Sequence, residues 1–296
     1  SLPLPSASPP TVASDEAVVP HAGHARPLHV LVAEDHPVNR AYLEAVLEKL
    51  GHHAVFAVDG DGAVRAVEAQ PESAAFDVVL MDLHMPGMDG FTAARTIRAM
   101  APPRGRVPIV ALTADAFQAS RHLAREAGMD DFLTKPAHLP QLREALARYG
   151  GGAVVPASHK AADALPGDAE SALDLATVDD VLEALSPPKY AALLAGFLGE
   201  RFAQIAGLRQ ALAAGARADL RSRAHALKGA ALSLGLRDVG ALAGQLQSTA
   251  HDAPIAELGA LVDRLERRFE ASVTECAQRA LLPATAATPP AAPAPA

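Results

Sequence analysis

The sequence is poor in cysteine and in aromatic residues. Its 296 residues include a single cysteine, Cys276, and no tryptophan, and aromatic residues make up only 4% of the chain. One cysteine excludes an internal disulfide framework and is typical of a reducing compartment. With so few aromatic rings, we expect a core built mainly from alanine and aliphatic side chains, within a hydrophobic content of 50%.

The chain also lacks a basic cluster and a long apolar run. Its formal net charge is −8, and residues 28–149 carry 12 Lys and Arg against 16 Asp and Glu, while residues 173–281 carry 12 against 13. This balance argues against nucleic-acid binding. No apolar run approaches the roughly 20 residues that a membrane-spanning helix needs, and no signal peptide is visible. We therefore expect a cytoplasmic segment without direct membrane contact.

Pattern-free segments divide the chain into two domains. The Pro- and Ala-rich ends, residues 1–27 and 282–296, and the Gly- and Ala-rich stretch 150–172 have no hydrophobic period, which predicts disordered linkers and a tail. The remaining segments, 28–149 and 173–281, are each long enough for a domain of ordinary size. Because the chain begins with serine, we expect it to be a piece of a longer polypeptide.

The first domain alternates between two kinds of pattern. Short apolar runs of strand character are separated by stretches with helical periodicity, which predicts a doubly wound α/β fold with a five-stranded parallel sheet. The apolar runs are "HVLVA", "HAVFAV", "FDVVLM", "VPIVAL" and "DFLT".

The second domain contains only helical patterns. Their short connections predict an all-α four-helix bundle with up-and-down topology. We expect its helices at residues 186–212, 216–234, 236–251 and 254–281.

Five polar residues follow the strands of the first domain. Glu34 and Asp35 follow the first strand, Asp82 the third, Thr113 the fourth and Lys135 the fifth. The carboxyl ends of parallel strands meet at one edge of a sheet, where ligands gather. Three carboxylates placed together repel one another unless a cation neutralises them, and oxygen ligands of this kind suit Mg²⁺.

These residue types match the needs of phosphoryl transfer. Asp82 would offer a nucleophilic oxygen, and Lys135 with the Thr113 hydroxyl would contact the oxygens of the incoming group. Pro136 follows the lysine directly, where a cis peptide bond would define the turn. Each residue alone has an ordinary explanation, such as a helix cap or a surface lysine, but all five at one edge make a candidate site.

The motifs around these residues resemble the response-regulator receiver domain. They are "VLVAEDHPVNR", "DVVLMDLHMPGMDG", "PIVALTADAF" and "MDDFLTKP", in the expected order across residues 28–149. The resemblance implies a flavodoxin-like fold, Asp82 as phospho-acceptor, and Mg²⁺ bound by Glu34, Asp35, Asp82 and the backbone carbonyl of His84. It also implies that Phe132 is the aromatic residue that reorients when Thr113 moves. "HPVNR" is similar to receivers of hybrid sensor kinases.

A histidine lies in a helical pattern of the second domain. An apolar stripe recurs at helical steps, and a polar line runs beside it one position later. The histidine of that line, His225, is therefore expected to face solvent, although a chance surface histidine would look the same. The stripe comprises Leu220, Ala224, Leu227, Ala231 and Leu234, and the line comprises Arg221, His225 and Lys228.

The stretch "HALKGAALSLG" resembles the histidine phosphotransfer (HPt) domain, a four-helix bundle. The resemblance implies that His225 carries a phosphoryl group, that Lys228 helps to neutralise it, and that Gly229 leaves room for a receiver. Gln247 lies where the family places a side chain that hydrogen-bonds the imidazole, and the alternative is a solvated polar residue.

We therefore predict a two-component phosphorelay module. Asp82 would accept a phosphoryl group from an upstream histidine kinase core and pass it through His225 to a downstream response regulator. No ATP-binding kinase pattern is present, so we expect the parent to be a hybrid sensor histidine kinase, with an anchor in the inner membrane left open. One alternative is a phospho-Asp switch whose helical domain only binds a partner or dimerises. The other alternative is a phosphatase of the haloacid dehalogenase type. That family needs a second acidic residue two positions after the nucleophile, where this chain has His84.

Overall fold

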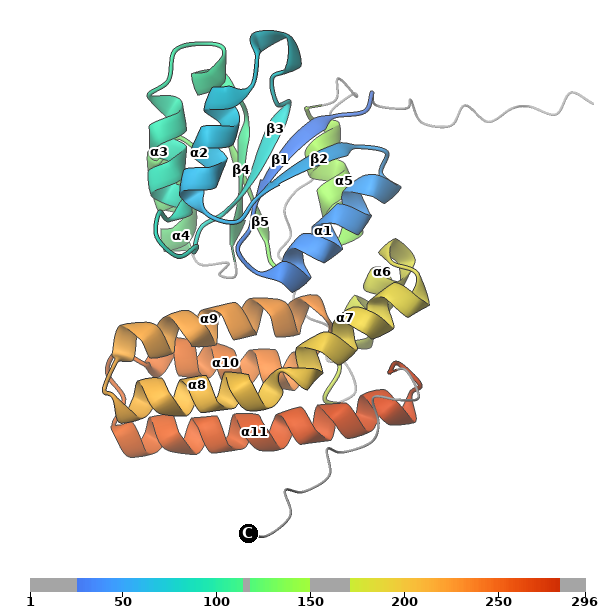
Figure 1. The fold of residues 1–296 in the computed structure, drawn as a ribbon, viewed down its shortest axis with the longest axis vertical. Helices are drawn as coiled ribbons and strands as arrows, with labels where there is room; N and C mark the ends of the chain where they lie inside the picture. The colour runs from blue at the N-terminus through green and yellow to red at the C-terminus, as the bar shows by residue number, and fades with distance from the viewer. Residues whose placement is uncertain (1–25, 114–117, 150–170, 283–296) are drawn as a thin grey trace, which may run out of the picture.

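A computed structural model describes residues 26–113, 118–149 and 171–282 as two domains stacked on one another (Figure 1). The predicted linkers and tail at 1–27, 150–172 and 282–296 lie almost entirely outside these residues, so their disorder stays a prediction.

The first domain is the predicted five-stranded parallel sheet. Its strand order is β2-β1-β3-β4-β5. Strands are therefore added on one side of β1 first and then on its other side, which makes a topological switch point between β1 and β3. Every residue of β3 and β4 is buried, which explains their continuous apolar sequences. The strands are β1 (His29–Ala33), β2 (His53–Ala57), β3 (Val78–Asp82), β4 (Ile109–Thr113) and β5 (Asp131–Thr134).

Helices cover both faces of this sheet (Figure 1). Side chains of α1 and α5 belong to one buried cluster, and those of α2, α3 and α4 belong to another. Local caps start two of them, because His36 accepts a bond from the Val38 amide and Asp89 accepts one from the Thr92 amide. The helices are α1 (Pro37–Lys49), α2 (Gly60–Ala69), α3 (Gly90–Arg98), α4 (Gln118–Glu126) and α5 (Leu139–Ala147), with short 3₁₀ turns at Glu72–Ala74 and Arg104–Arg106.

The second domain is helical, as predicted, but it has six helices where four were expected. The long helix predicted at 186–212 is divided after Gly199, a residue of low helix propensity. An additional short helix, α6, precedes the bundle and packs against the first domain (Figure 1). The helices are α6 (Leu175–Ala184), α7 (Pro187–Gly199), α8 (Arg201–Ala213), α9 (Arg217–Ser233), α10 (Arg237–Thr249) and α11 (Ile255–Gln278).

The expectation that no apolar run is long enough to cross a membrane needs a correction. The combined stretch Pro187–Ala213 of α7 and α8 meets that criterion by length and composition, with a mean hydropathy of 1.2. In the structure it packs within the bundle, and Arg201 pairs with Glu270 of α11. Arg209 of the same stretch pairs with two further acidic residues of α11.

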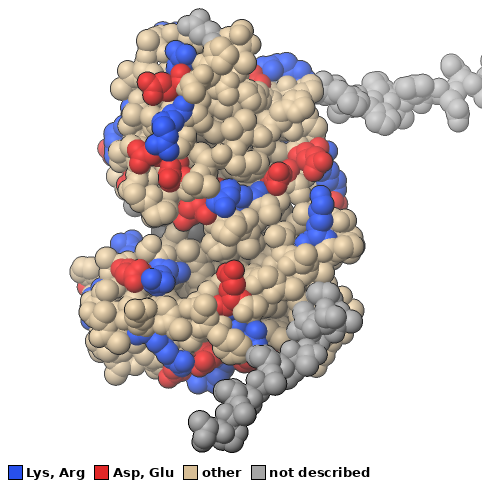
Figure 2. All heavy atoms as spheres, viewed as in Figure 1, with Lys and Arg blue, Asp and Glu red and all other residues tan. Residues whose placement is uncertain are grey.

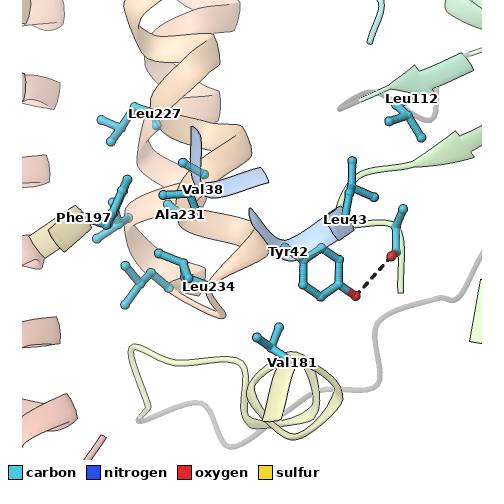
Figure 3. Close-up of a cluster of buried hydrophobic side chains, with 14 of the residues drawn as sticks. Val38, Tyr42, Leu43, Leu112, Val181, Phe197, Leu227, Ala231 and Leu234 are labelled. Atoms are coloured by element: carbon cyan, nitrogen blue, oxygen red, sulfur yellow. Dashed lines mark hydrogen bonds between the residues drawn. The ribbon is translucent and has the colours of Figure 1, made fainter. Parts of the chain in front are cut away.

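The two domains share one apolar cluster (Figure 3). It connects Val38 and Tyr42 of α1 with Val181 of α6 and with Ala231 of α9. The Tyr42 hydroxyl donates a 3.2 Å hydrogen bond to the Ala137 carbonyl, so its ring is held between the helices. Because an apolar contact of this kind leaves little room for water, the described domains are docked rather than merely adjacent.

Candidate functional site

Three carboxylates converge at the carboxyl edge of the sheet. Glu34 and Asp35 follow β1 and Asp82 ends β3, and each offers an oxygen within 4.8 Å of the others. Glu34 is fully buried and Asp82 is 2% exposed. The structure thus brings together the three acidic residues that the sequence singled out.

Lys135 lies among these carboxylates. Its Nζ donates to Asp82 Oδ2 at 2.6 Å and to Glu34 Oε2 at 2.5 Å, and its side chain is only 7% exposed. Burial alone would lower the pKa of Lys135, but the two carboxylates outweigh burial and raise it. The peptide bond to Pro136 is cis, as predicted, and the Lys135 amide donates to the Thr113 carbonyl at 2.7 Å.

The site retains an excess of negative charge. The pKa of Asp35 is raised to about 6, first by burial and then by Asp82 and Glu34. One ammonium group faces three carboxylates, so the oxygen set has room for a further cation. Hard oxygen donors at this spacing fit Mg²⁺. The amide of His84 donates to Asp82 Oδ1 at 3.1 Å, which holds the chain after β3 close to these oxygens.

Thr113 and Phe132 lie on the neighbouring strands. Thr113 ends β4 and is 1% exposed, while Phe132 of β5 is half-buried. The Arg121 guanidinium lies 4.0 Å from the centre of the Phe132 ring, a cation–π contact. Thr113 is therefore at the same edge of the sheet as the acidic cluster, whereas Phe132 pairs with Ala111, two residues before the end of β5.

His225 lies on α9 directly beneath this edge. Its ring centroid is 4.4 Å from that of His84, and a nitrogen of His225 lies within 4.8 Å of a carboxylate oxygen of Asp82. The expectation that His225 faces solvent is therefore wrong for the docked chain. The helix does turn this residue outward from the bundle, but the receiver covers it and leaves it half-buried.

The other expected residues of the second domain surround His225. The charge of Lys228 is near enough to lower the pKa of the imidazole slightly. Gln247 raises that pKa through a weak hydrogen bond, yet its Oε1 and the Nδ1 of His225 are both buried without a well-formed bond to any described atom. Gln247 therefore lies close to the imidazole without a well-formed hydrogen bond to it.

Gly229 faces the first domain rather than the metal site itself. A Cβ added there would lie 3.5 Å from Nδ2 of Asn39. Asn39 donates to Glu34 Oε1 at 2.8 Å and is 5% exposed, and its Oδ1 has no hydrogen-bond partner among the described atoms. Asn39 was not among the predicted site residues, although a polar residue in the buried first turn of α1 is a signal that could have identified it.

A cleft of about 390 Å³ opens beside the two histidines. Both domains line it, and the surface is visibly hollowed between them (Figure 2). Arg221 and Arg217 of α9 face this cleft together with Asp35 and Asp89. It therefore offers a path for water and small ions to the carboxylates.

Comparisons with known proteins agree with this geometry. The model of the response regulator receiver domain matches residues 30–147, and that of the Hpt domain matches residues 192–275. The chain carries a receiver domain and an Hpt domain. It is a module of a two-component phosphorelay, and its receiver contributes the acidic site while its Hpt domain contributes His225.

Curated relatives are larger proteins. The chain is 33% identical over 207 residues to the sensor histidine kinase GacS of Pseudomonas protegens, covering 68% of this chain and 22% of GacS. It is 31% identical over 245 residues to the sensory/regulatory protein RpfC of Xanthomonas campestris, covering 78% of this chain and 31% of RpfC. The chain therefore spans less than a third of either relative.

A solved structure similar to the first domain is the receiver domain of a Pseudomonas aeruginosa sensor histidine kinase. That receiver was crystallised with a magnesium ion coordinated in its active-site cleft. The two are 42% identical, and the match covers 43% of this chain and 99% of the other, with a TM-score of 0.39.

The docked arrangement should weaken in acid. The pKa of His225 is lowered to about 3, first by burial and next by the charges of His84 and Lys135. An exposed imidazole has a pKa near 6.5, so docking is fully favoured above about pH 6.5 and loses stability as the pH falls toward 3. We expect small-angle scattering to show a larger radius of gyration at about pH 5 than at pH 7.5. The variant His225→Gln should open less with acid, and an identical opening would contradict this cause.

Proposed function

We propose that Asp82 accepts a phosphoryl group from the phosphohistidine of an upstream kinase core and passes it to His225 of the same chain. His225 would then donate the group to the aspartate of a downstream response regulator. The observation that carries this proposal is the separation between donor and acceptor, since a nitrogen of His225 lies within 4.8 Å of an oxygen of Asp82.

That separation suits an in-line transfer. A reacting nitrogen and phosphorus atom need to approach to about 3–3.5 Å, with the leaving oxygen on the opposite side of phosphorus. A phosphorus atom bonded to Asp82 would lie next to His225, because an oxygen of Asp82 and a nitrogen of His225 are within 4.8 Å of one another. Thr113 and Lys135 lie at the same carboxyl edge of the sheet, where they can contact the phosphoryl oxygens.

The chain's own groups support the bond changes. The lone pair of a His225 nitrogen forms the new N–P bond, and the O–P bond to Asp82 breaks with its electrons left on the carboxylate. The low pKa of His225 keeps its imidazole neutral and its lone pair available. The ammonium of Lys135, 2.6 Å from Asp82, stabilises the carboxylate that leaves. Gln247 would select which ring nitrogen attacks.

Mg²⁺ belongs to the proposal as a resident ion of the receiver. Glu34, Asp35, Asp82 and the backbone carbonyl of His84 would hold it. When bound, the ion neutralises charge on the phosphoryl oxygens. The excess of carboxylate over ammonium at this edge is the support from the chain itself.

The wider setting rests on the relatives. Their names describe sensor histidine kinases and a sensory/regulatory protein, which supports an upstream kinase core in the same parent chain. We place the segment on the cytoplasmic side of the inner membrane, with a separate response regulator downstream. The switch alternative, in which the bundle only binds a partner, is not favoured, because the Hpt match includes His225.

A labelling experiment tests the order of transfer. The full chain, Asp82→Asn and His225→Gln would be incubated with Mg²⁺ and a radiolabelled phosphorylated kinase core. We expect base-stable, acid-labile label on the wild type, no label on Asp82→Asn, and base-labile acyl phosphate alone on His225→Gln. Wild-type chain carrying only base-labile label would show that His225 is not an acceptor and would overturn the relay.

A further inference from the structure

Contacts between the domains extend beyond the phosphotransfer site. Helix α6 packs against α1 and α5 of the receiver, on the side away from the cleft (Figure 1). The Hpt match begins at residue 192, so α6 (Leu175–Ala184) lies outside it. This helix is therefore an addition that the match to the phosphotransfer bundle does not explain.

An ion pair and a histidine–carboxylate contact join α6 to the receiver. Nζ of Lys49, at the end of α1, lies 3.1 Å from Glu183 Oε1 and also donates to the Glu183 backbone carbonyl. Nδ1 of His138, just before α5, lies 2.9 Å from Asp180 Oδ2. The lysine thus meets both the side chain and the carbonyl end of α6, where a positive charge also complements the helix dipole.

Apolar contact lies between these pairs. Val181 is adjacent to Asp180 and is 2% exposed, and it belongs to the same buried cluster as Val38 and Tyr42 of α1 (Figure 3). A buried apolar centre with charged pairs at its rim is the usual anatomy of a specific protein interface. Paired charges at a rim contribute more to the choice of partner than to raw affinity.

We infer that α6 is a docking element that selects the chain's own receiver as the donor to His225. The inference rests on the proposed Asp82-to-His225 transfer and names the residues that decide its partner. Asp180 and Glu183 are three residues apart and so lie on one face of α6, where they present two acidic groups to Lys49 and His138. A receiver without basic groups at these places would dock on α9 without this support.

A charge-swap experiment tests the role of α6. Full-length chains would be phosphorylated at Asp82 with radiolabelled acetyl phosphate and Mg²⁺, and acyl phosphate and phosphohistidine would be measured separately over time. We expect Lys49→Glu and Glu183→Lys each to slow the appearance of phosphohistidine by about two- to tenfold, as the loss of a partly exposed ion pair predicts. The double variant, with the charges exchanged, should recover most of the rate.

Controls separate this inference from the proposed function. Glu270→Lys breaks the pair between the exposed Glu270 and the largely buried Arg201 inside the bundle, far from α6, and should transfer at the wild-type rate. The wild-type rate should not depend on chain concentration, since donor and acceptor belong to one chain. Equal transfer rates in the single variants, the double variant and the wild type would overturn the docking role alone. Acyl phosphate on Asp82 with no phosphohistidine in any chain would overturn the relay itself.

Discussion

Replacement of Lys135 by methionine is expected to lower the free energy of unfolding of the receiver by about 3–5 kcal/mol in Mg²⁺-free buffer near pH 8. The ammonium lies within 2.6 Å of both Glu34 and Asp82, and all three side chains are at most 7% exposed. Without it, buried carboxylates face one another with no internal cation. Removing one partner of a buried ion pair strongly destabilises the protein, because the remaining charge stays buried without a compensating charge.

The loss should depend on pH and on metal. Burial raises the pKa of Asp35 to about 6 and the charge of Lys135 opposes this rise, so without the lysine Asp35 should take up a proton as the pH falls and the deficit should shrink toward pH 6. Mg²⁺ should restore more stability to Lys135→Met than to the wild type, because it binds a site with one more negative charge.

Urea unfolding with and without Mg²⁺ at both pH values measures these effects. Lys189→Met, which changes an exposed lysine of α7, is the control and should unfold like the wild type. A deficit below about 1 kcal/mol at pH 8, or equal stabilisation of both chains by Mg²⁺, would contradict the cation role of Lys135.

Replacement of Gly90 by alanine is expected to damage the acceptor site directly. A Cβ at Gly90 would lie 2.1 Å from the Asp82 carbonyl oxygen and 3.0 Å from Cα of Leu83. Both contacts are with backbone, so no flexible side chain can move aside. Overpacking of this kind costs about 1–3 kcal/mol or more, and a displacement of about 1 Å at a reacting group can reduce the rate 100-fold.

The expected result is a receiver that is less stable and slow to label. Phosphorylation of Asp82 by acetyl phosphate should fall by about 100-fold in Gly90→Ala, as measured by the yield of base-labile label. Gly196→Ala is the matched control, because an added Cβ in the middle of α7 meets no described atom within 4 Å. That control should gain up to about 1 kcal/mol of stability and label normally. Normal labelling of Gly90→Ala would show that the backbone at Asp82 tolerates displacement.

The parts of the fold and of the site that could be predicted from the sequence are those that depend on local patterns. The carboxyl ends of parallel strands lie at one edge of the sheet, whatever the length of the connections between the strands. Glu34, Asp82 and Lys135 could therefore be placed together from the strand positions alone. The helical period around His225 likewise predicted a side chain turned away from the bundle core. One helix was missed for a local reason, since α6 directly follows a stretch that had been assigned to a linker.

Contacts between distant segments required the tertiary structure. The sequence by itself determined two domains, the acidic edge of the sheet and the residue types needed for phosphoryl transfer, because each depends on short-range periodicity. Only the docked structure decided that His84 covers His225, that Asn39 faces Gly229 and that α6 lies on the receiver. The contacts of His225, of Gly229 and of α6 with α1 join segments more than 100 residues apart, and they depend on how two completed surfaces fit, which no local pattern encodes.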